Sequence, residues 1–147
     1  MGKVAGWPQQ PGHHAETVVR IKDGPDRSPA SKTTVSDPGL TLAAEERDRV
    51  YRIALQGELD VSTAPRFNAA LADPRIRRCH TLVVDLSELR FMDSTGLSAV
   101  LVGEMHARTS GQRFAIVQGP RHVQELFRLT GVDHFLDVVE GEAPGRE

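Results

Sequence analysis

Residues 81–97 read TLVVDLSELRFMDSTGL. The run from Thr81 to Leu86 is short, apolar and rich in β-branched residues, which is typical of a strand covered on both faces. Residues 87–90 have the composition of a loop, and a helix is expected to follow from about Ser94 to Thr109. A buried strand that leads into a helix in this way predicts an α/β domain.

Upstream of this stretch the sequence predicts a hairpin. Residues 40–44 form a short apolar run, and the charged residues 45–48 (EERD) are expected to form a turn. In residues 50–56 every second side chain is apolar, and that period of two predicts a second strand. We expect this strand to stop at Gly57, which opens the sequence GELD of residues 57–60.

A helix is expected between the hairpin and the buried strand. Ser62 or Thr63 is suited to its N-cap, and Pro65 fits the first turn, where a missing N–H does no harm. One apolar face follows from the spacing of three side chains, and Asp73-Pro74 is expected to end the helix. The three side chains are Ala64, Phe67 and Leu71.

The downstream sequence repeats the alternation of strand and helix. Residues 114–117 (FAIV) predict another buried strand, residues 121–129 a third helix with Gly131 at its C-terminal end, and residues 136–139 a last short strand. The predicted order is β-β-α-β-α-β-α-β. We therefore expect a single α/β domain over residues 40–140, with a mixed sheet, mainly parallel central strands and helices packed on it.

The two ends of the chain have a different composition. Residues 1–39 contain five prolines and few apolar residues, so we expect a disordered N-terminal extension. Residues 16–22 (ETVVRIK) are the one strand candidate within it. Residues 141–147 are expected to form a disordered tail.

Bulk composition excludes several classes of function. A formal net charge of -2 gives no bulk attraction to nucleic acid, and we interpret Arg75, Arg77 and Arg78 as a solvated turn. No apolar stretch approaches the roughly 20 residues of a membrane span, and we expect no signal peptide, no membrane partner and a cytoplasmic location. The single cysteine, Cys79, cannot form an internal disulfide and is expected to be a buried apolar side chain. We expect no metal and no cofactor.

Enzymatic activity is not expected either. Residues 92–96 (MDSTG) lack the first glycine of the nucleophile motif G-x-S-x-G, and the chain has no phosphate-binding G-x-x-x-x-G-K-[ST] loop. The histidines of the domain have no recognisable general-base context; they are His80, His106, His122 and His134.

GELD at residues 57–60 and DLSELRFMDSTGL at residues 85–97 together resemble the STAS family, which includes anti-sigma-factor antagonists and domains of sulfate transporters. The resemblance covers residues 40–139. It implies a non-enzymatic antagonist that binds an anti-sigma factor, a serine kinase of ATPase-like fold, and releases a sigma factor. The alternative is an accessory or scaffold subunit of a transporter or stress-sensing complex that uses the same fold without a phospho-switch.

The resemblance also assigns roles to individual residues. It implies that Ser94 is phosphorylated, with Thr95 as the alternative, because Thr95 stands where a serine often follows the phosphosite. It further implies a partner-binding surface that contains Asp60, Asp93 and Gly96 besides these two residues.

The residues themselves leave two readings of Ser94 open. Its position at a helix start suits a plain N-cap, and taken alone the sequence favours that role. The same position also suits a phosphate, because free N–H groups and the positive end of the helix dipole favour negative charge there.

Overall fold

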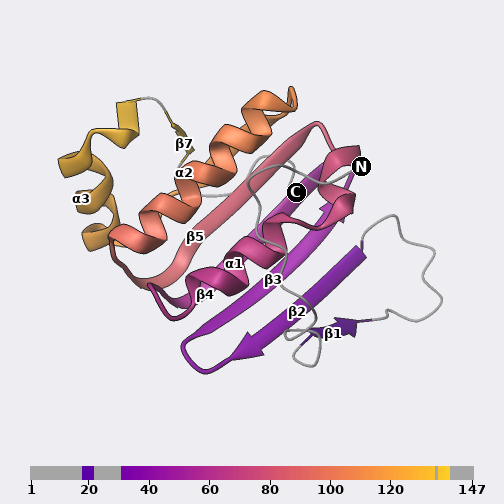
Figure 1. Cartoon of the computed structure of the whole chain (residues 1–147), viewed down its shortest axis with the longest axis horizontal. Helices are drawn as coiled ribbons and strands as arrows, with labels where there is room; N and C mark the ends of the chain where they lie inside the picture. Colours follow the sequence, from indigo (N-terminus) through magenta and orange to yellow (C-terminus); the bar gives the residue numbers. More distant parts are fainter. Residues whose placement is uncertain (1–17, 22–30, 135, 140–147) are drawn as a thin grey trace.

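The computed structural model describes residues 18–21, 31–134 and 136–139, which form one seven-stranded sheet and three α-helices (Figure 1). The strands are β1 (Val18–Ile21), β2 (Ser31–Asp37), β3 (Leu40–Arg47), β4 (Val50–Leu59), β5 (Thr81–Met92), β6 (Arg113–Val117) and β7 (Asp137–Val139). The helices are α1 (Ala64–Leu71), α2 (Ser94–Thr109) and α3 (Arg121–Thr130), with short 3-10 turns η2 (Pro74–Arg78) and η3 (Val132–His134).

The sheet joins an antiparallel half to a parallel half. The strands lie in sequence order, with antiparallel pairing from β1 to β4 and parallel pairing from β4 to β7. Each parallel connection contains one helix, and all three helices cover the same face of the sheet (Figure 1). The predicted fold class and the order β-β-α-β-α-β-α-β are thereby confirmed for residues 40–139.

The main core lies between that face and the helices. Tyr51, Ile53 and Leu55 alternate along β4 as predicted and are buried, with relative exposures of 0–2%. The predicted stripe of α1, which includes Phe67, is buried against them. Burying a side chain as large as Phe67 contributes about 1.5–3 kcal/mol to the free energy of unfolding. None of the helices in the described ranges has the length and hydrophobicity needed to cross a bilayer.

The predicted hairpin is present, but its turn was placed too early. β3 continues to Arg47, which pairs with Val50, so that only Asp48 and Arg49 form the turn. Both turn residues have positive φ angles, 52° and 66°, as the two-residue turns that match strand twist require. The charged residues 45–47 belong to the strand because they pair with residues 50–52 of β4, where Glu45 faces Arg52 and Glu46 lies beside Tyr51 and Cys79.

Two strand ends were also predicted too early. β4 does not stop at Gly57 but continues to Leu59, and residues 87–90 belong to β5 rather than to a loop. The two strands remain paired up to Leu59 and Met92, although the register shifts at two points. One shift lies at Gly57, whose φ is 116°. A bulge interrupts the alternation of side chains, which explains why the period of two did not reveal these extensions.

The N-terminal extension contains more structure than its composition predicted. β1 lies within the strand candidate of residues 16–22, and β2 pairs with β3 over seven residue pairs, from Ser31–Glu46 to Asp37–Leu40. The expectation of disorder is therefore wrong for residues 18–21 and 31–37, because backbone pairing to an existing sheet orders a strand of low hydrophobicity. The rest of that expectation, residues 1–17 and 22–30, and the tail 141–147 lie outside the described residues.

Candidate functional site

The two sequence motifs meet at the carboxyl ends of β4 and β5. Leu59 and Met92 are the last residues of the two strands and pair with each other. The next backbone N–H, that of Asp93, donates a hydrogen bond to the carbonyl of Leu59 at 3.3 Å. The segments that follow the two strands therefore begin side by side, as expected after neighbouring parallel strands. We call these segments, residues 60–63 and 93–96, the two-loop site.

Gly96 fixes how closely the two loops approach. A Cβ atom at this position would lie 2.4 Å from the backbone oxygen of Leu59 and 2.9 Å from its Cγ. The start of α2 thus packs directly on the end of β4, at a distance that only glycine permits. Gly96 is buried, so its role in the site is to hold the loops together rather than to present a side chain.

Asp93, not Ser94, is the N-cap of α2. Its backbone is extended, with φ -109° and ψ -171°, and its Oδ1 accepts a hydrogen bond from the N–H of Gly96 at 3.0 Å. This is the geometry by which an aspartate satisfies a free donor of the first turn. The reading of Ser94 as a plain N-cap is therefore wrong, because the residue before it already performs that role.

Ser94 is the first residue of α2 and is exposed, as is Thr95. Among the described residues, none of the hydrogen bonds involves the Ser94 hydroxyl. The side chain stands next to the first N–H groups of a 16-residue helix, where the backbone dipole favours negative charge. A group added to its oxygen would project from the surface without breaking an existing contact.

Asp60 organises the other loop. Its Oδ1 accepts hydrogen bonds from the Ser62 N–H at 3.0 Å, from the Ser62 hydroxyl at 2.9 Å and from the Thr63 N–H at 3.2 Å. Thr63 closes the loop by donating from Oγ1 to the carbonyl of Glu58 at 2.8 Å. The hydroxyl of Ser62 is the main cause that lowers the pKa of Asp60. Asp60 is therefore ionised at neutral pH and partly exposed.

The two-loop site groups hydroxyl and carboxylate side chains at the carboxyl ends of β4 and β5. It combines exposed hydroxyls on Ser94 and Thr95 with the carboxylates of Asp60 and Asp93. Both carboxylates already accept hydrogen bonds from their own loops. Within the described part of the chain, no side chain is hydrogen-bonded to Ser94.

Comparison with known proteins agrees with this geometry. Residues 42–140, about two-thirds of the chain, match the family described as "Mlab, STAS domain". The chain belongs to the STAS domain family. The two-loop site is therefore an edge of a STAS domain, and β1 and β2 precede the part of the chain that matches the family.

Relatives of this STAS domain are anti-sigma factor antagonists. The anti-sigma-B factor antagonist of Staphylococcus epidermidis is 31% identical over 103 residues, which cover 69% of this chain and 94% of the relative. Among solved structures, an anti-sigma factor antagonist from Mycobacterium paratuberculosis is 25% identical and matches with a TM-score of 0.62 over 70% of this chain and 87% of its own. The Bacillus cell fate determinant SpoIIAA in its phosphorylated form shares the fold, at 20% identity and a TM-score of 0.56 over 69% of this chain and 91% of its own.

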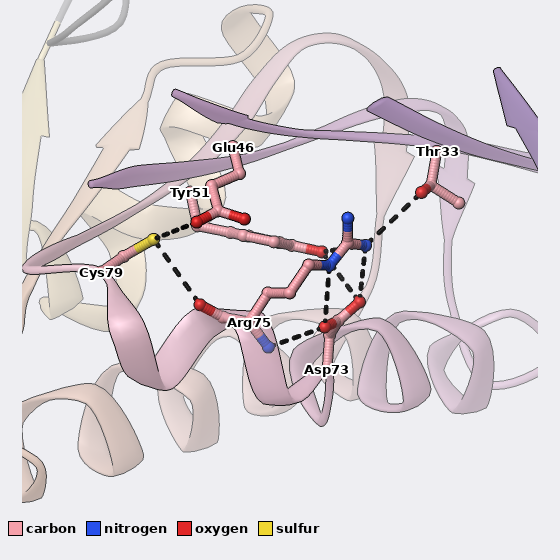
Figure 2. A network of polar contacts seen from close by, with 6 residues as sticks. All are labelled: Thr33, Glu46, Tyr51, Asp73, Arg75 and Cys79. Carbon is pink, nitrogen blue, oxygen red and sulfur yellow. Dashed lines mark hydrogen bonds and ion pairs between the residues drawn. The ribbon is translucent and has the colours of Figure 1, made fainter. Parts of the chain in front are cut away.

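A second polar cluster lies at the opposite end of β4 (Figure 2). Arg75 in η2 donates from Nη2 to Asp73 Oδ2 at 2.8 Å and to Thr33 Oγ1 in β2 at 3.4 Å, and it lies over the ring of Tyr51. The hydroxyl of Tyr51 in turn donates to Asp73 at 3.2 Å. Arg75 was interpreted as part of a solvated turn, but the structure shows that it joins β2, β4 and η2. No local pattern indicated this, because its partners Thr33 and Tyr51 are distant in sequence.

The charges of this polar network are fixed by burial and by pairing. Burial is the largest influence on Asp73 and opposes ionisation, but the hydrogen bonds and charge of Arg75 outweigh it, so that the pKa of Asp73 is lowered. Burial, followed by the charge of Glu46, raises the pKa of the Cys79 thiol to about 11. Cys79 is 4% exposed, which confirms its prediction as a buried side chain. We assign the network a structural role in this STAS domain.

Asp73→Asn is expected to reduce the free energy of unfolding by about 1–2 kcal/mol at pH 7, since the charge-assisted bonds to Arg75 are weakened. A lowered pKa gives stability that is present above the unfolded-state value, about 3.9, and is lost as the pH falls through the folded-state value. The difference between the two proteins should therefore shrink below pH 4. Urea unfolding at pH 7 and pH 3 measures it.

The control is Asp137→Asn. Asp137 pairs with Arg113 at 2.8 Å, but both side chains are about half exposed, so this change is expected to cost less than about 1 kcal/mol. Equal losses for the two variants would contradict the structural role assigned to the polar network.

Proposed function

We propose that this protein is an anti-sigma factor antagonist whose partner is an anti-sigma factor serine kinase of ATPase-like fold. The unphosphorylated chain binds the kinase through the two-loop site, and the kinase releases its sigma factor. Phosphorylation of Ser94 ends the interaction. The role of antagonist is the one that the relatives have. We add three proposals to it: that the partner is a kinase, that phosphorylation switches binding off, and that binding releases a sigma factor.

The observation that carries this proposal is the state of Ser94. The residue is exposed, its hydroxyl has no hydrogen bond within the described residues, and a neighbouring aspartate already caps the helix. Phosphoryl transfer would form a bond between Ser94 Oγ and the γ-phosphorus of ATP and break the bond to ADP. The hydroxyl proton would pass to a base of the kinase. The antagonist supplies a hydroxyl that is free to react and a fold that does not need to rearrange.

Electrostatics supply the direction of the switch. A phosphoserine adds a charge of about -1.5 to -2 at neutral pH. The phosphate would lie next to Asp93 in the sequence, and Asp60 belongs to the other loop of the same two-loop site. A partner surface that accommodates a neutral serine would then face a dense negative charge, which favours dissociation.

Incubation with the kinase and ATP tests the proposal. Mass spectrometry of the intact protein and its peptides is expected to find one phosphate, on Ser94. Ser98 provides a matched control, because it is also exposed and lies one turn further along α2. Ser98→Ala should accept a phosphate as the original chain does, whereas Ser94→Ala should accept none.

Two other outcomes would change the assignment. A phosphate on Thr95 with none on Ser94 would move the switch by one residue. Binding of the kinase without phosphate on either residue would contradict the phospho-switch. It would favour the alternative role, an accessory or scaffold subunit that uses the STAS fold for binding alone.

A further inference from the structure

The second face of the sheet is buried in part, although none of the described helices lies on it. All three helices cover the other face (Figure 1). On the face turned away from them, which we call the back face, Val83, Ala115 and Val117 form a separate apolar cluster and are 0–1% exposed. Parallel strands are normally covered on both faces, and the apolar run of residues 81–86 predicted such a strand. The described helices account for the cover of only one face.

One row of paired residues shows where the cover of the back face lies. The row runs through β3, β4, β5 and β6 and consists of Ala43, Ala54, Asp85 and Val117. Ala43 is exposed and Ala54 is half-buried. In contrast, Asp85 is 5% exposed and Val117 is 1% exposed. Asp85 and Val139 flank Val117 but have side chains of similar height, so they do not shield its methyl groups from above. A further layer of atoms is therefore needed over β5 and β6, but not over β3.

The charges around the cluster are already paired with one another. Arg52 forms an ion pair with Asp85 and lies 4.0 Å from Glu45, and Arg113 pairs with Asp137 at 2.8 Å. The Nε atom of Arg52 is buried as well. Other charged side chains of this face are exposed and lie outside the cover, among them Arg47 and Glu88. A segment that brought another charge over the cluster would bury it without a partner, so an uncharged segment fits best.

Composition selects one segment as this cover. Residues 22–30 (KDGPDRSPA) and 140–147 (EGEAPGRE) have only alanine and proline as apolar side chains. The single residue 135 precedes β7, whose other end pairs with Val117. Residues 1–17 (MGKVAGWPQQPGHHAET) contain Met1, Val4 and Trp7, and residues 4–15 contain no aspartate, glutamate, lysine or arginine. The N-terminal segment therefore offers the large apolar side chains and the lack of charge that the back face requires.

The N-terminal segment is also long enough to reach the cluster. It precedes β1, which is four strands away from β5 and five from β6. Neighbouring strands are about 4.8 Å apart, so the distance across the sheet is roughly 19–24 Å. Trp7 precedes Val18, the first residue of β1, by 11 residues. An extended chain of that length spans about 36 Å.

We propose that residues 1–17 of the same chain fold back across the sheet and that Trp7 packs on Val83, Ala115 and Val117. The back face is then an intramolecular docking surface. The N-terminal extension, which composition alone predicts to be disordered, becomes part of the domain. This inference does not depend on the proposed function, because the two-loop site lies at the carboxyl ends of β4 and β5 and the apolar cluster lies on the back face.

Fluorescence of the full-length protein tests the inference, because Trp7 is the only tryptophan in the chain. Its emission is expected at a shorter wavelength in the native protein than in urea, and acrylamide should quench it several-fold less. The emission should change at the same urea concentration as the circular dichroism signal, since one cooperative transition would release both the segment and the sheet. Native emission and quenching equal to those of the unfolded chain would overturn the inference.

Two variants of the back face test where Trp7 lies. Val139 is half-buried beside Val117 at the edge of the cluster, and Val139→Asp is expected to shift Trp7 emission toward that of the unfolded chain. Ala43→Asp is the matched control, because it places the same charge on the same face at an exposed position, and it should leave the emission unchanged. Circular dichroism checks that both variants fold. Unchanged emission in a folded Val139→Asp variant would contradict the proposed location.

The melting temperature provides a measurement that does not depend on changing the sheet. Trp7→Ala in the full-length chain is expected to lower it by about 5–10 °C, whereas Trp7→Phe, which keeps an aromatic ring, should lower it by only a few degrees. An unchanged melting temperature in Trp7→Ala would contradict the packing of Trp7. Sedimentation over a range of protein concentrations identifies the source of the cover. A short emission wavelength that appears only as dimers form would assign the cover to a second copy and overturn the intramolecular contact.

Discussion

Gly96→Ala is expected to lower the melting temperature of this STAS domain by about 10 °C or more. The added Cβ would lie 2.4 Å from the backbone oxygen of Leu59, and the obstacle is main chain rather than a side chain that can rotate away. Relief therefore requires that the start of α2 move off the end of β4. That movement would also break the hydrogen bond from the Asp93 N–H to the same carbonyl.

Gly103→Ala is the appropriate control because Gly103 lies in the same helix and is also buried. Its Cβ would meet Leu71 Cδ1 at 3.1 Å, and that atom is the end of a flexible side chain. Alanine is favoured over glycine in a helix interior by about 1 kcal/mol, which offsets the tighter contact. We expect its melting temperature to change by only a few degrees. Thermal unfolding followed by circular dichroism measures both variants, and equal stability would contradict the close approach of the two loops.

The order of the elements could be predicted from the sequence, but the packing of the site could not. The order of strands and helices follows from local periodicity, because Tyr51, Ile53 and Leu55 must all face one core. The identity of the site residues followed only from the resemblance of two short motifs to a family. The contact between Gly96 in α2 and Leu59 in β4 joins residues that are far apart in the sequence. The sequence around a glycine in a helix does not show whether another part of the chain fills the space where a side chain would lie.

The errors in the predicted boundaries have a common physical cause. Each lies where pairing between strands overrides local composition. β2 is ordered by its ladder with β3, and β5 extends to Met92 because β4 continues beside it through bulges. Arg75 was predicted to be solvated because its local sequence does not show two of its partners. Those partners, Thr33 in β2 and Tyr51 in β4, are distant in the sequence.

Ser94→Asp is expected to weaken binding to the anti-sigma factor kinase by about 2–5 kcal/mol, a factor of tens to thousands in Kd. The carboxylate reproduces part of the charge of a phosphate at the centre of the proposed interface. Ser94→Ala should bind as the unphosphorylated chain does, resist modification and leave the sigma factor permanently free. Titration of each variant with the kinase gives the affinities, and transcription from a promoter that depends on the sigma factor gives the consequence.

The same substitution separates loss of binding from loss of fold. An acidic side chain at the first position of a helix is stabilised by the backbone dipole by about 0.3–1 kcal/mol, so Ser94→Asp should melt no lower than the original chain. Ser98→Asp places the same charge one turn further along α2 and is expected to bind with much less loss. Equal weakening by the two variants would show that the partner responds to total negative charge. A lowered melting temperature in Ser94→Asp would show that the surface serine contributes to the fold. A surface switch requires that Ser94→Asp binds the kinase weakly, that Ser98→Asp does not, and that both variants keep the melting temperature of the original chain.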